Sequence, residues 1–404
     1  MGVTFQFFMN MEIERYSLAR GESVFVGFAR LFKYFPIWFI LSTFFAWIWP
    51  GIIATSARIF TEVFKFSNPN LVGIMFLILI GVILSLGTVV YKTVEKLALV
   101  LIAVSVPLIF GLTFYLTNVN DLLDLARGVV NFGFVPETLP LASFLAAFAF
   151  SGAGGNLNLA QSFYIKEKGY AMGKYSGKIT SLLSGQSQNL SLEGAKFEIT
   201  NENLIKFKSW WNLTNLEHFL VFWGGGVVTI LLLSLLAYST SYGLVTPGNG
   251  VDFIIFEAGV IAARIGVFVG TSFLLIAGLM LFNTQLTVLD ATSRIMAENL
   301  LILKKDRWGG KTLPRIYYSF LWAQIFFGII IFLFNFGQPL LLLTISAVLN
   351  AVAMFIHIGL TLFLNIKTLD KEIRPSYIRV FAMLSAFIFF GYFSFKTIMS
   401  AFFG

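Results

Sequence analysis

Apolar stretches recur along nearly the whole chain, and their length constrains the fold more than any other feature. A helix of about 20 apolar residues crosses a bilayer. Ten stretches are long enough, at roughly residues 2–18, 36–60, 71–91, 97–117, 139–165, 218–240, 253–284, 316–335, 339–365 and 380–402. Only 12% of the residues are charged, against about 25% in soluble proteins. The sequence predicts an all-α, multi-pass membrane protein whose single domain, residues 1–404, lies in a lipid bilayer.

The connections between these stretches alternate in charge. Most of the 28 lysines and arginines fall in every second connection, whereas the other connections contain only Lys65 and Arg127. Basic connections normally face the cytoplasm. We therefore expect a cell-membrane protein whose basic loops are cytoplasmic, the long loop over about residues 166–217 among them. This topology accounts for the net charge of +8 without a nucleic-acid partner.

The same topology places the first stretch with its amino end outside. Two explanations are open: a short amino terminus is translocated, or a helix that normally precedes this stretch is missing. The usual dominance of early helices in setting orientation favours the missing helix.

The fifth stretch contains three glycines within four residues, Gly152, Gly154 and Gly155, and Asn156 and Asn158 follow directly. Each glycine costs a helix about 1 kcal/mol relative to alanine. Discontinuous helices form the ion and substrate sites of many transporters, so we expect a broken helix with a site at 151–156. The alternative is close helix packing through small residues.

The chemistry of such a break leaves two substrate classes open. Free carbonyl groups near Ala153 and the amide oxygens of the two asparagines suit hard cations such as Mg²⁺ or Mn²⁺. The positive end of the second half-helix favours a small anion instead. A buried amide must find partners, which makes Asn350 in the ninth stretch a further candidate.

Ionisable residues inside the stretches are functional candidates by default. Glu12 and Arg15 are spaced to pair on one helix face, and with Glu14 they are alternatively part of a proton or ion relay. Glu257 and Arg264 lie two turns apart on one face of the seventh stretch. Whether either faces a cavity is open.

Enzymatic motifs are missing from the sequence. It has no G-x-S-x-G, no H-E-x-x-H and no P-loop. The chain contains no cysteine and only two histidines, His218 and His357, which are far apart in the sequence. We therefore expect neither an enzyme nor a resident cofactor.

Six short stretches resemble the Nramp family of divalent metal transporters, and more closely its divergent Nramp-related prokaryotic branch. They are Asn10–Glu22, Gly152–Ser162, Lys168–Gly173, Trp210–Glu217, Leu289–Ile295 and Gly337–Leu340. The resemblance implies an inverted-repeat fold of the leucine-transporter type with eleven helices. This chain would supply helices two to eleven, and the first helix of the family, with its metal-binding Asp and Asn, has no counterpart.

The sequence departs from the family at the break. Typical members carry Met-Pro-His-Asn where this chain has residues 153–156, so only Asn156 matches. The resemblance makes Ala153 and Asn156 the metal-binding positions, without the family's soft thioether ligand. This loss favours harder ions such as Mg²⁺ or Mn²⁺.

The combined prediction is a secondary transporter that moves divalent cations by alternating access. Its substrate would contact Gly152 to Asn158 and Asn350, with Gln338 nearby. Two alternatives remain: an amino-acid or other small-solute transporter of the same fold, and a transport-inactive remnant that lost its site with the first helix. The sequence does not indicate the oligomeric state.

Overall fold

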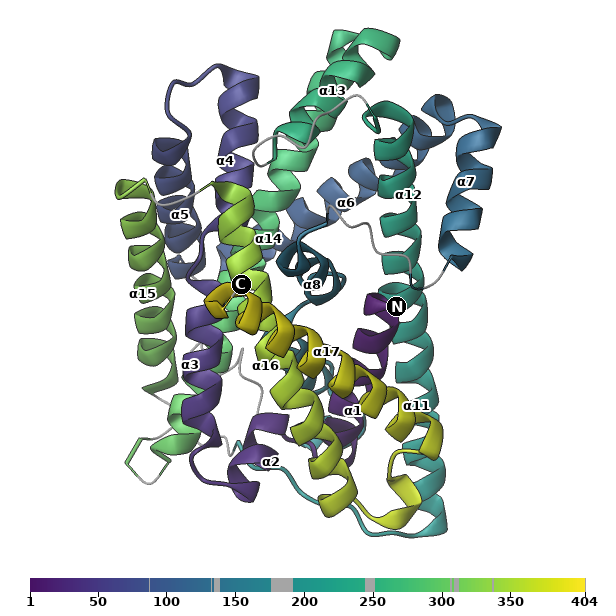
Figure 1. Ribbon diagram of the computed structural model, residues 1–404. Helices are drawn as coiled ribbons and strands as arrows, with labels where there is room; N and C mark the ends of the chain where they lie inside the picture. The colour runs from purple at the N-terminus through teal and green to yellow at the C-terminus, as the bar shows by residue number, and fades with distance from the viewer. Residues whose placement is uncertain are drawn as a thin grey trace.

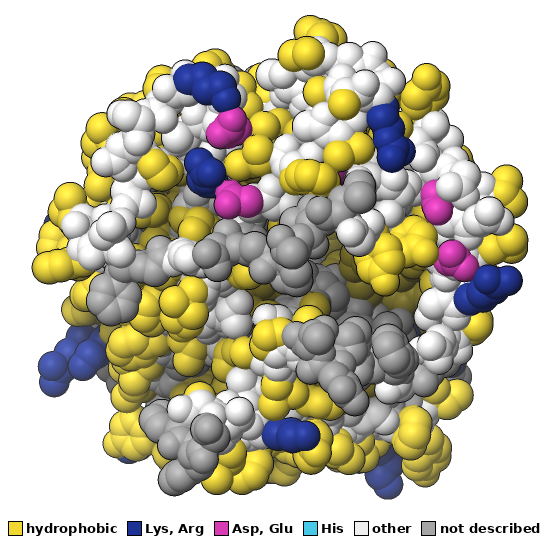
Figure 2. Space-filling model, turned by 45° about the horizontal axis from the view of Figure 1, so that its top comes forward, with side chains coloured by type: hydrophobic (Ala, Val, Ile, Leu, Met, Phe, Trp, Pro, Cys, Tyr) yellow, Lys and Arg dark blue, Asp and Glu magenta, His cyan; other side chains and the backbone are white. Residues whose placement is uncertain are grey.

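The computed structural model describes residues 1–86, 88–131, 133, 139–175, 192–243, 251–305, 307–308, 312–335 and 338–403. These residues form helices and connections without any strand. Within the described ranges, seven helical spans are long and apolar enough to cross a membrane, as a multi-pass membrane protein requires. Figure 2 shows apolar side chains over much of one face, with only scattered charges between them.

The amino-terminal half begins with α1 (Gly2–Arg20), which ends at Gly21 in a left-handed conformation with φ 67°. The helices that follow are α2 (Val24–Leu31), α3 (Phe35–Trp47), α4 (Gly51–Phe64), α5 (Pro69–Ser85), α6 (Thr88–Leu116) and α7 (Val119–Val130). The predicted stretch 36–60 is thus two helices. Pro50 lacks a backbone N–H, and its ring clashes with the preceding turn, which favours an interruption of the helix at this point.

The next elements are α8 (Leu141–Ala149), the 3₁₀ helix η1 (Gly155–Ala160), α9 (Gln161–Lys168) and η2 (Ala171–Tyr175). The predicted break in the fifth stretch is confirmed. Gly154 and Gly155 have φ angles of 77° and 54°, a region that residues with a Cβ rarely enter. The backbone geometry therefore explains why the glycines stand here.

The carboxyl-terminal part of the predicted loop over 166–217 is helical, and residues 176–191 of that loop lie outside the described residues. α11 (Asn201–His218) continues through a π-helical turn, η3 (Phe219–Gly224), into α12 (Gly225–Thr240). Together they form one 40-residue helix. Its start has a sequence signal, because the Thr200 side chain accepts a hydrogen bond from the Asn203 N–H, which is a typical N-cap.

The predicted stretch 253–284 is also two elements: α13 (Asp252–Ile265) and the 37-residue α14 (Val267–Leu303). Gly266, with φ 139°, separates them. The spanning helix therefore begins after Glu257 and Arg264, which both lie on the short α13. The chain ends with α15 (Leu313–Leu333), α16 (Pro339–Thr368), the 3₁₀ turn η5 (Lys371–Ile373) and α17 (Tyr377–Phe403).

Connections rich in basic residues gather at one end of the bundle. In Figure 1, α2 and the α16–α17 connection lie at the bottom, whereas the α4–α5 connection, α7 and α13 lie at the top. α14 packs against both α3 and α4, and α16 packs against α8, α17 and η1. α8 and η1 therefore lie inside the bundle, which places the helix break among packed helices.

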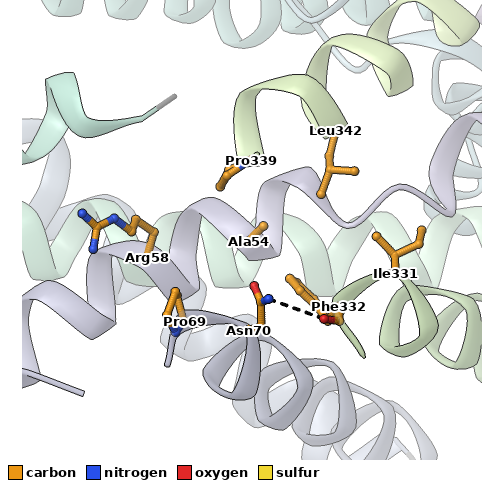
Figure 3. A pocket seen from close by; sticks show the side chains of 8 residues that line it. All are labelled: Ala54, Arg58, Pro69, Asn70, Ile331, Phe332, Pro339 and Leu342. Carbon is orange, nitrogen blue, oxygen red and sulfur yellow. Dashed lines mark hydrogen bonds between the residues drawn. The ribbon is translucent and has the colours of Figure 1, made fainter. Parts of the chain in front are cut away.

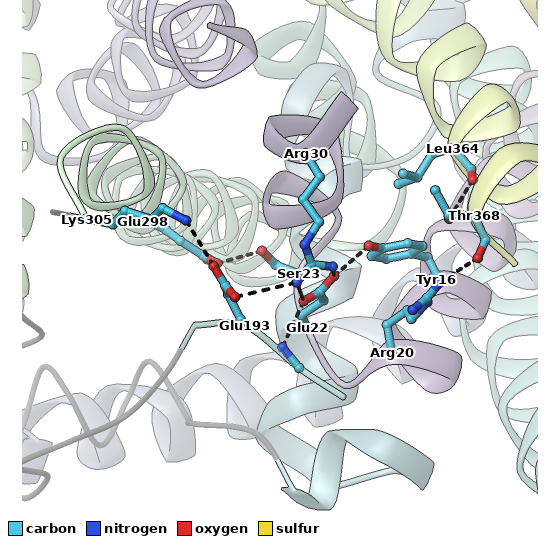
Figure 4. A network of polar contacts seen from close by, with 11 residues as sticks. Tyr16, Arg20, Glu22, Ser23, Arg30, Glu193, Glu298, Lys305, Leu364 and Thr368 are labelled. Atoms are coloured by element: carbon cyan, nitrogen blue, oxygen red, sulfur yellow. Dashed lines mark hydrogen bonds and ion pairs between the residues drawn. The ribbon is translucent and has the colours of Figure 1, made fainter. Parts of the chain in front are cut away.

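A polar network fixes the bottom end (Figure 4). The Glu22 carboxylate accepts hydrogen bonds from the Tyr16 hydroxyl at 2.6 Å and from the Gly194 N–H at 2.8 Å, and it pairs with Arg30. Ser23 donates to Glu298 of α14 at 2.6 Å. These contacts join the α1–α2 corner to α14 and to the segment that leads into α11.

Candidate functional site

Gln6 of α1 spans the helix break. Its side-chain amide nitrogen donates to the carbonyl oxygens of Phe148 and Ala149, both at 3.1 Å, and to the Ser151 hydroxyl at 3.2 Å. Its carbonyl oxygen accepts a hydrogen bond from the Gly154 N–H at 3.4 Å. A completely buried glutamine thus joins the end of α8 to the Gly154 N–H on the other side of the break. Sequence analysis did not identify Gln6 as a site residue. Its only signal in the sequence is an amide side chain between the apolar residues Phe5 and Phe7.

Asn156 is anchored on one side and unpaired on the other. Its side-chain nitrogen donates to the hydroxyls of Ser42 at 2.8 Å and Thr43 at 2.9 Å, both on α3. Its side-chain oxygen has no hydrogen-bond partner, and neither polar atom of the Asn158 side chain has one. Both asparagines are buried, so these amide oxygens are enclosed without a hydrogen-bond partner.

α16 lies directly against the break. His357 Nε2 lies 3.0 Å from the Gly155 carbonyl oxygen. Asn350 donates to the Ser346 carbonyl at 3.0 Å, and its own side-chain oxygen is unpaired. A Cβ atom on Gly155 would lie 1.8 Å from that oxygen. The structure therefore brings Asn350 to the break, as predicted.

Gln338 is not brought to the break. It is an exposed residue at the amino end of α16, about 18 Å along the helix from Asn350 at 1.5 Å per residue. The adjoining Pro339 and Leu342 line a separate small pocket of about 80 Å³ together with Asn70 and Phe332 (Figure 3). Nothing in this pocket connects it to the break.

Two larger pockets adjoin the break, and Gly152 lines both. The first, of about 500 Å³, is mainly apolar and includes Trp47, Phe150, Ala153 and Leu157. The second, called here the Glu14 pocket, is about 470 Å³ in volume. It is lined by Glu14, Ser151, Gly152, Gln161, Tyr164, Thr214, Glu217, His218, Val221, Phe222 and Gly226.

The Glu14 pocket supplies the acidic groups that the break lacks. Glu14 is 1% exposed, and one of its oxygens lies 3.4 Å from His218 Nδ1. Glu217 accepts hydrogen bonds from the hydroxyls of Tyr164 and Tyr170. Burial, together with this bond to Glu217, raises the pKa of Tyr170. Sequence analysis did not single out Glu217 or His218 as site residues, because only the fold brings α11 against α1.

The other predicted relay residues are engaged in structural contacts. Arg15 donates to Glu12 at 2.8 Å and to the Ile373 carbonyl at 3.1 Å. Glu12 also accepts from Asn365 at 3.1 Å and from Arg379 at 3.4 Å. This buried ion network joins α1, α16 and α17, in agreement with the pairing that the i, i+3 spacing predicts.

Glu257 and Arg264 lie away from the break, against the end of α12. Glu257 is buried and accepts a hydrogen bond from Thr240 at 3.3 Å, and the exposed Arg264 donates to the Ser239 carbonyl at 3.3 Å. Burial raises the pKa of Glu257 to about 7. The structure does not bring these two residues to either of the pockets that adjoin the break.

In the described part of the chain, no three His, Cys, Asp or Glu side chains converge to hold a bare metal ion. An ion at the break would therefore keep part of its water shell. Searches against protein-family models and against curated proteins find no match. These comparisons identify neither a family nor a substrate.

Proposed function

We propose that the chain is a membrane transporter for divalent cations of the Mg²⁺ or Mn²⁺ class, with the binding site at the break between α8 and η1. The observation that carries the proposal is the set of buried, unpaired amide oxygens on Asn156, Asn158 and Asn350. A buried polar atom without a partner costs about 1–3 kcal/mol. A bound cation would remove that cost.

The charge around the break supports a cation over an anion. The break's own polar groups are largely taken up by Gln6. Glu14 and Glu217 add negative charge in the pocket that Ser151 and Gly152 also line. An anion at this position would meet two carboxylates, whereas a divalent cation is attracted by both.

The donor atoms support a hard ion. All three unpaired side chains offer amide oxygens, and the chain has no cysteine. Oxygen ligands suit Mg²⁺ and Mn²⁺, and Mg²⁺ in particular retains several waters when it is bound. Two pockets of several hundred cubic ångströms, both lined by Gly152, adjoin the break and have the volume for such a hydrated ion.

The resemblance to the Nramp family adds the finer parts of the proposal. These are about ten spanning segments in an inverted-repeat arrangement of the leucine-transporter type, cytoplasmic basic loops in the cell membrane, and alternating access. A helix broken at membrane depth fits this mechanism, since such breaks lie where one bundle moves against another.

The test is uptake of Mn²⁺ and Mg²⁺ into liposomes that contain the full chain. Asn350→Ala should lower uptake about tenfold or more, because it removes one of the unpaired oxygens. Asn203→Ala, a change to an amide near the amino end of α11, is the matched control and should leave uptake unchanged. Excess amino acid should not compete.

Two results would contradict the proposal: no saturable uptake of either ion, or uptake by Asn350→Ala equal to that of the unmodified chain. Competition by an amino acid would instead indicate a small-solute transporter.

A further inference from the structure

The Glu14 pocket contains two carboxyl groups, the buried one of Glu14 and the partly buried one of Glu217. In the described part of the chain, neither Glu14 nor Glu217 forms an ion pair with a lysine or arginine. One Glu14 oxygen, Oε2, has no hydrogen-bond partner although the side chain is almost completely buried. Buried charges in proteins are paired, or they coordinate metals. The Glu14 carboxyl group is therefore either neutralised by a proton or balanced by a bound cation.

His218 is held so that one ring nitrogen is buried without a hydrogen-bond partner. Its Nδ1 lies 3.4 Å from Glu14 Oε1. The ring stacks on Phe222 with a centroid distance of 4.7 Å and an interplanar angle of 18°. A proton on Nδ1 makes that contact favourable, because the N–H then donates to the carboxylate. In this tautomer Nε2, which has no partner, keeps its lone pair.

A histidine that donates one N–H to a carboxylate and presents its other nitrogen is the usual arrangement of a metal ligand. Thr214 lies one turn before His218 on α11, and its buried hydroxyl is also unpaired. Glu14, Thr214 and His218 are each at least nine-tenths buried, and all three line the same pocket.

We propose that the Glu14 pocket is a second cation site, distinct from the amide oxygens at the break, and that it binds a hydrated divalent transition-metal ion. His218 Nε2 is the direct protein ligand, and Glu14 orients the imidazole ring through Nδ1–H and adds negative charge beside it. The Thr214 hydroxyl and the charge of Glu217 act on the water shell of the ion. A nitrogen ligand favours Mn²⁺ or Zn²⁺ over Mg²⁺.

The pocket lies beside the break, since Ser151 and Gly152 line it. An ion held there would be next to the proposed transport site. The inference goes beyond the proposed function and does not depend on it, because binding can be measured without transport.

The experiment uses the purified full chain with Mn²⁺. Electron paramagnetic resonance gives the amount of bound Mn²⁺, and electron spin echo modulation reports a directly bonded ¹⁴N nucleus. The unmodified chain should show ¹⁴N modulation. His218→Gln should abolish the modulation, and Glu14→Gln should weaken Mn²⁺ binding at this site about tenfold or more. Glu202→Gln, at an exposed residue near the start of the same helix, is the matched control and should change neither signal.

Asn350→Ala separates this inference from the proposed function. It should lower uptake into liposomes and leave the ¹⁴N modulation intact. If no variant transports any ion but the ¹⁴N modulation is present and is lost in His218→Gln, the second site stands and the transport proposal fails.

Two outcomes would overturn the second site: no ¹⁴N modulation in the unmodified chain, or modulation that persists in His218→Gln. Glu14 would then be neutralised by a proton. Circular dichroism and gel filtration of each variant show whether a lost signal reflects misfolding. Glu14→Gln, which keeps the size of the side chain, provides a second variant if His218→Gln fails to fold.

Discussion

The close approach of η1 to α16 makes Gly155→Ala the most informative substitution at the break. The added Cβ would lie 1.8 Å from the side-chain oxygen of Asn350 and 2.6 Å from its Cγ, far inside van der Waals contact. Gly155 also has φ 54°, which costs a residue with a Cβ about 1–2 kcal/mol. Overpacking a buried site costs about a further 1–3 kcal/mol. Gly155→Ala should therefore lower the free energy of unfolding by about 2–5 kcal/mol.

The assay is the apparent melting temperature of the purified chain in detergent. At on the order of 2 °C per kcal/mol for a chain of this size, the expected decrease is roughly 4–10 °C. Gly128→Ala is the matched control, because no atom lies within 4 Å of a Cβ added there on α7, and a helical glycine replaced by alanine should not lower the melting temperature.

The double variant Gly155→Ala/Asn350→Ala tests the cause of the decrease. Removing the Asn350 amide removes the two closest atoms and leaves the Cβ of that residue, 3.0 Å away. The double variant should then be less destabilised than the sum of the single variants by about 1–3 kcal/mol. Strict additivity, or a Gly155→Ala protein that melts like the unmodified chain, would refute the contact between η1 and α16.

Two further predictions concern neighbouring contacts. Gln6→Leu removes the hydrogen bonds of the Gln6 side chain to the Ala149 carbonyl oxygen and the Gly154 N–H, and it should lower the free energy of unfolding by about 1–3 kcal/mol. The change is seen as a lower melting temperature; unchanged melting would mean that Gln6 does not hold the break. Burial raises the pKa of Glu257 from 4.5 to about 7. Between these two pH values the folded form retains a proton that the unfolded form has lost. The α12–α13 contact should therefore weaken as the pH rises from about 4.5 to about 7. Hydrogen exchange of α13 should show this loss of protection, on the order of 2–3 kcal/mol, and Glu257→Gln should abolish it. A protection factor of α13 that does not change with pH in the unmodified chain would contradict the reasoning.

The proposed transport site and the second cation site contain polar groups of different chemistry. The break offers neutral amide oxygens, and the Glu14 pocket offers a carboxylate and an imidazole nitrogen. A chain with both would discriminate between ions at two adjacent positions. The flux and resonance experiments above address the two positions separately.

Several features were determined by local sequence. Apolar length alone predicts an all-helical, multi-pass chain, because burying about 20 residues in lipid requires every backbone polar group to be paired within the helix. The glycines at 152–155 predict the break, since only glycine readily adopts the positive φ angles found there. The pairing of Glu12 with Arg15 follows from their spacing on one turn of α1.

Local signals were misread where one residue divides a long apolar stretch. Gly266 separates α13 from α14, and Pro50 separates α3 from α4, although hydrophobicity runs through both positions. The start of α11 at Asn201 was missed because its first turns are polar and resemble a loop in composition. The cap at Thr200 was the available signal.

Only the tertiary structure decided which polar groups meet. Gln6 reaches the end of α8, Asn350 reaches Gly155, and His218 reaches Glu14, in each case from a helix distant in the chain. No periodicity or spacing encodes such contacts, because they depend on how whole helices pack. The sequence by itself therefore determined where the helix breaks, and the packing of α1, α11 and α16 around that break decided which groups surround it.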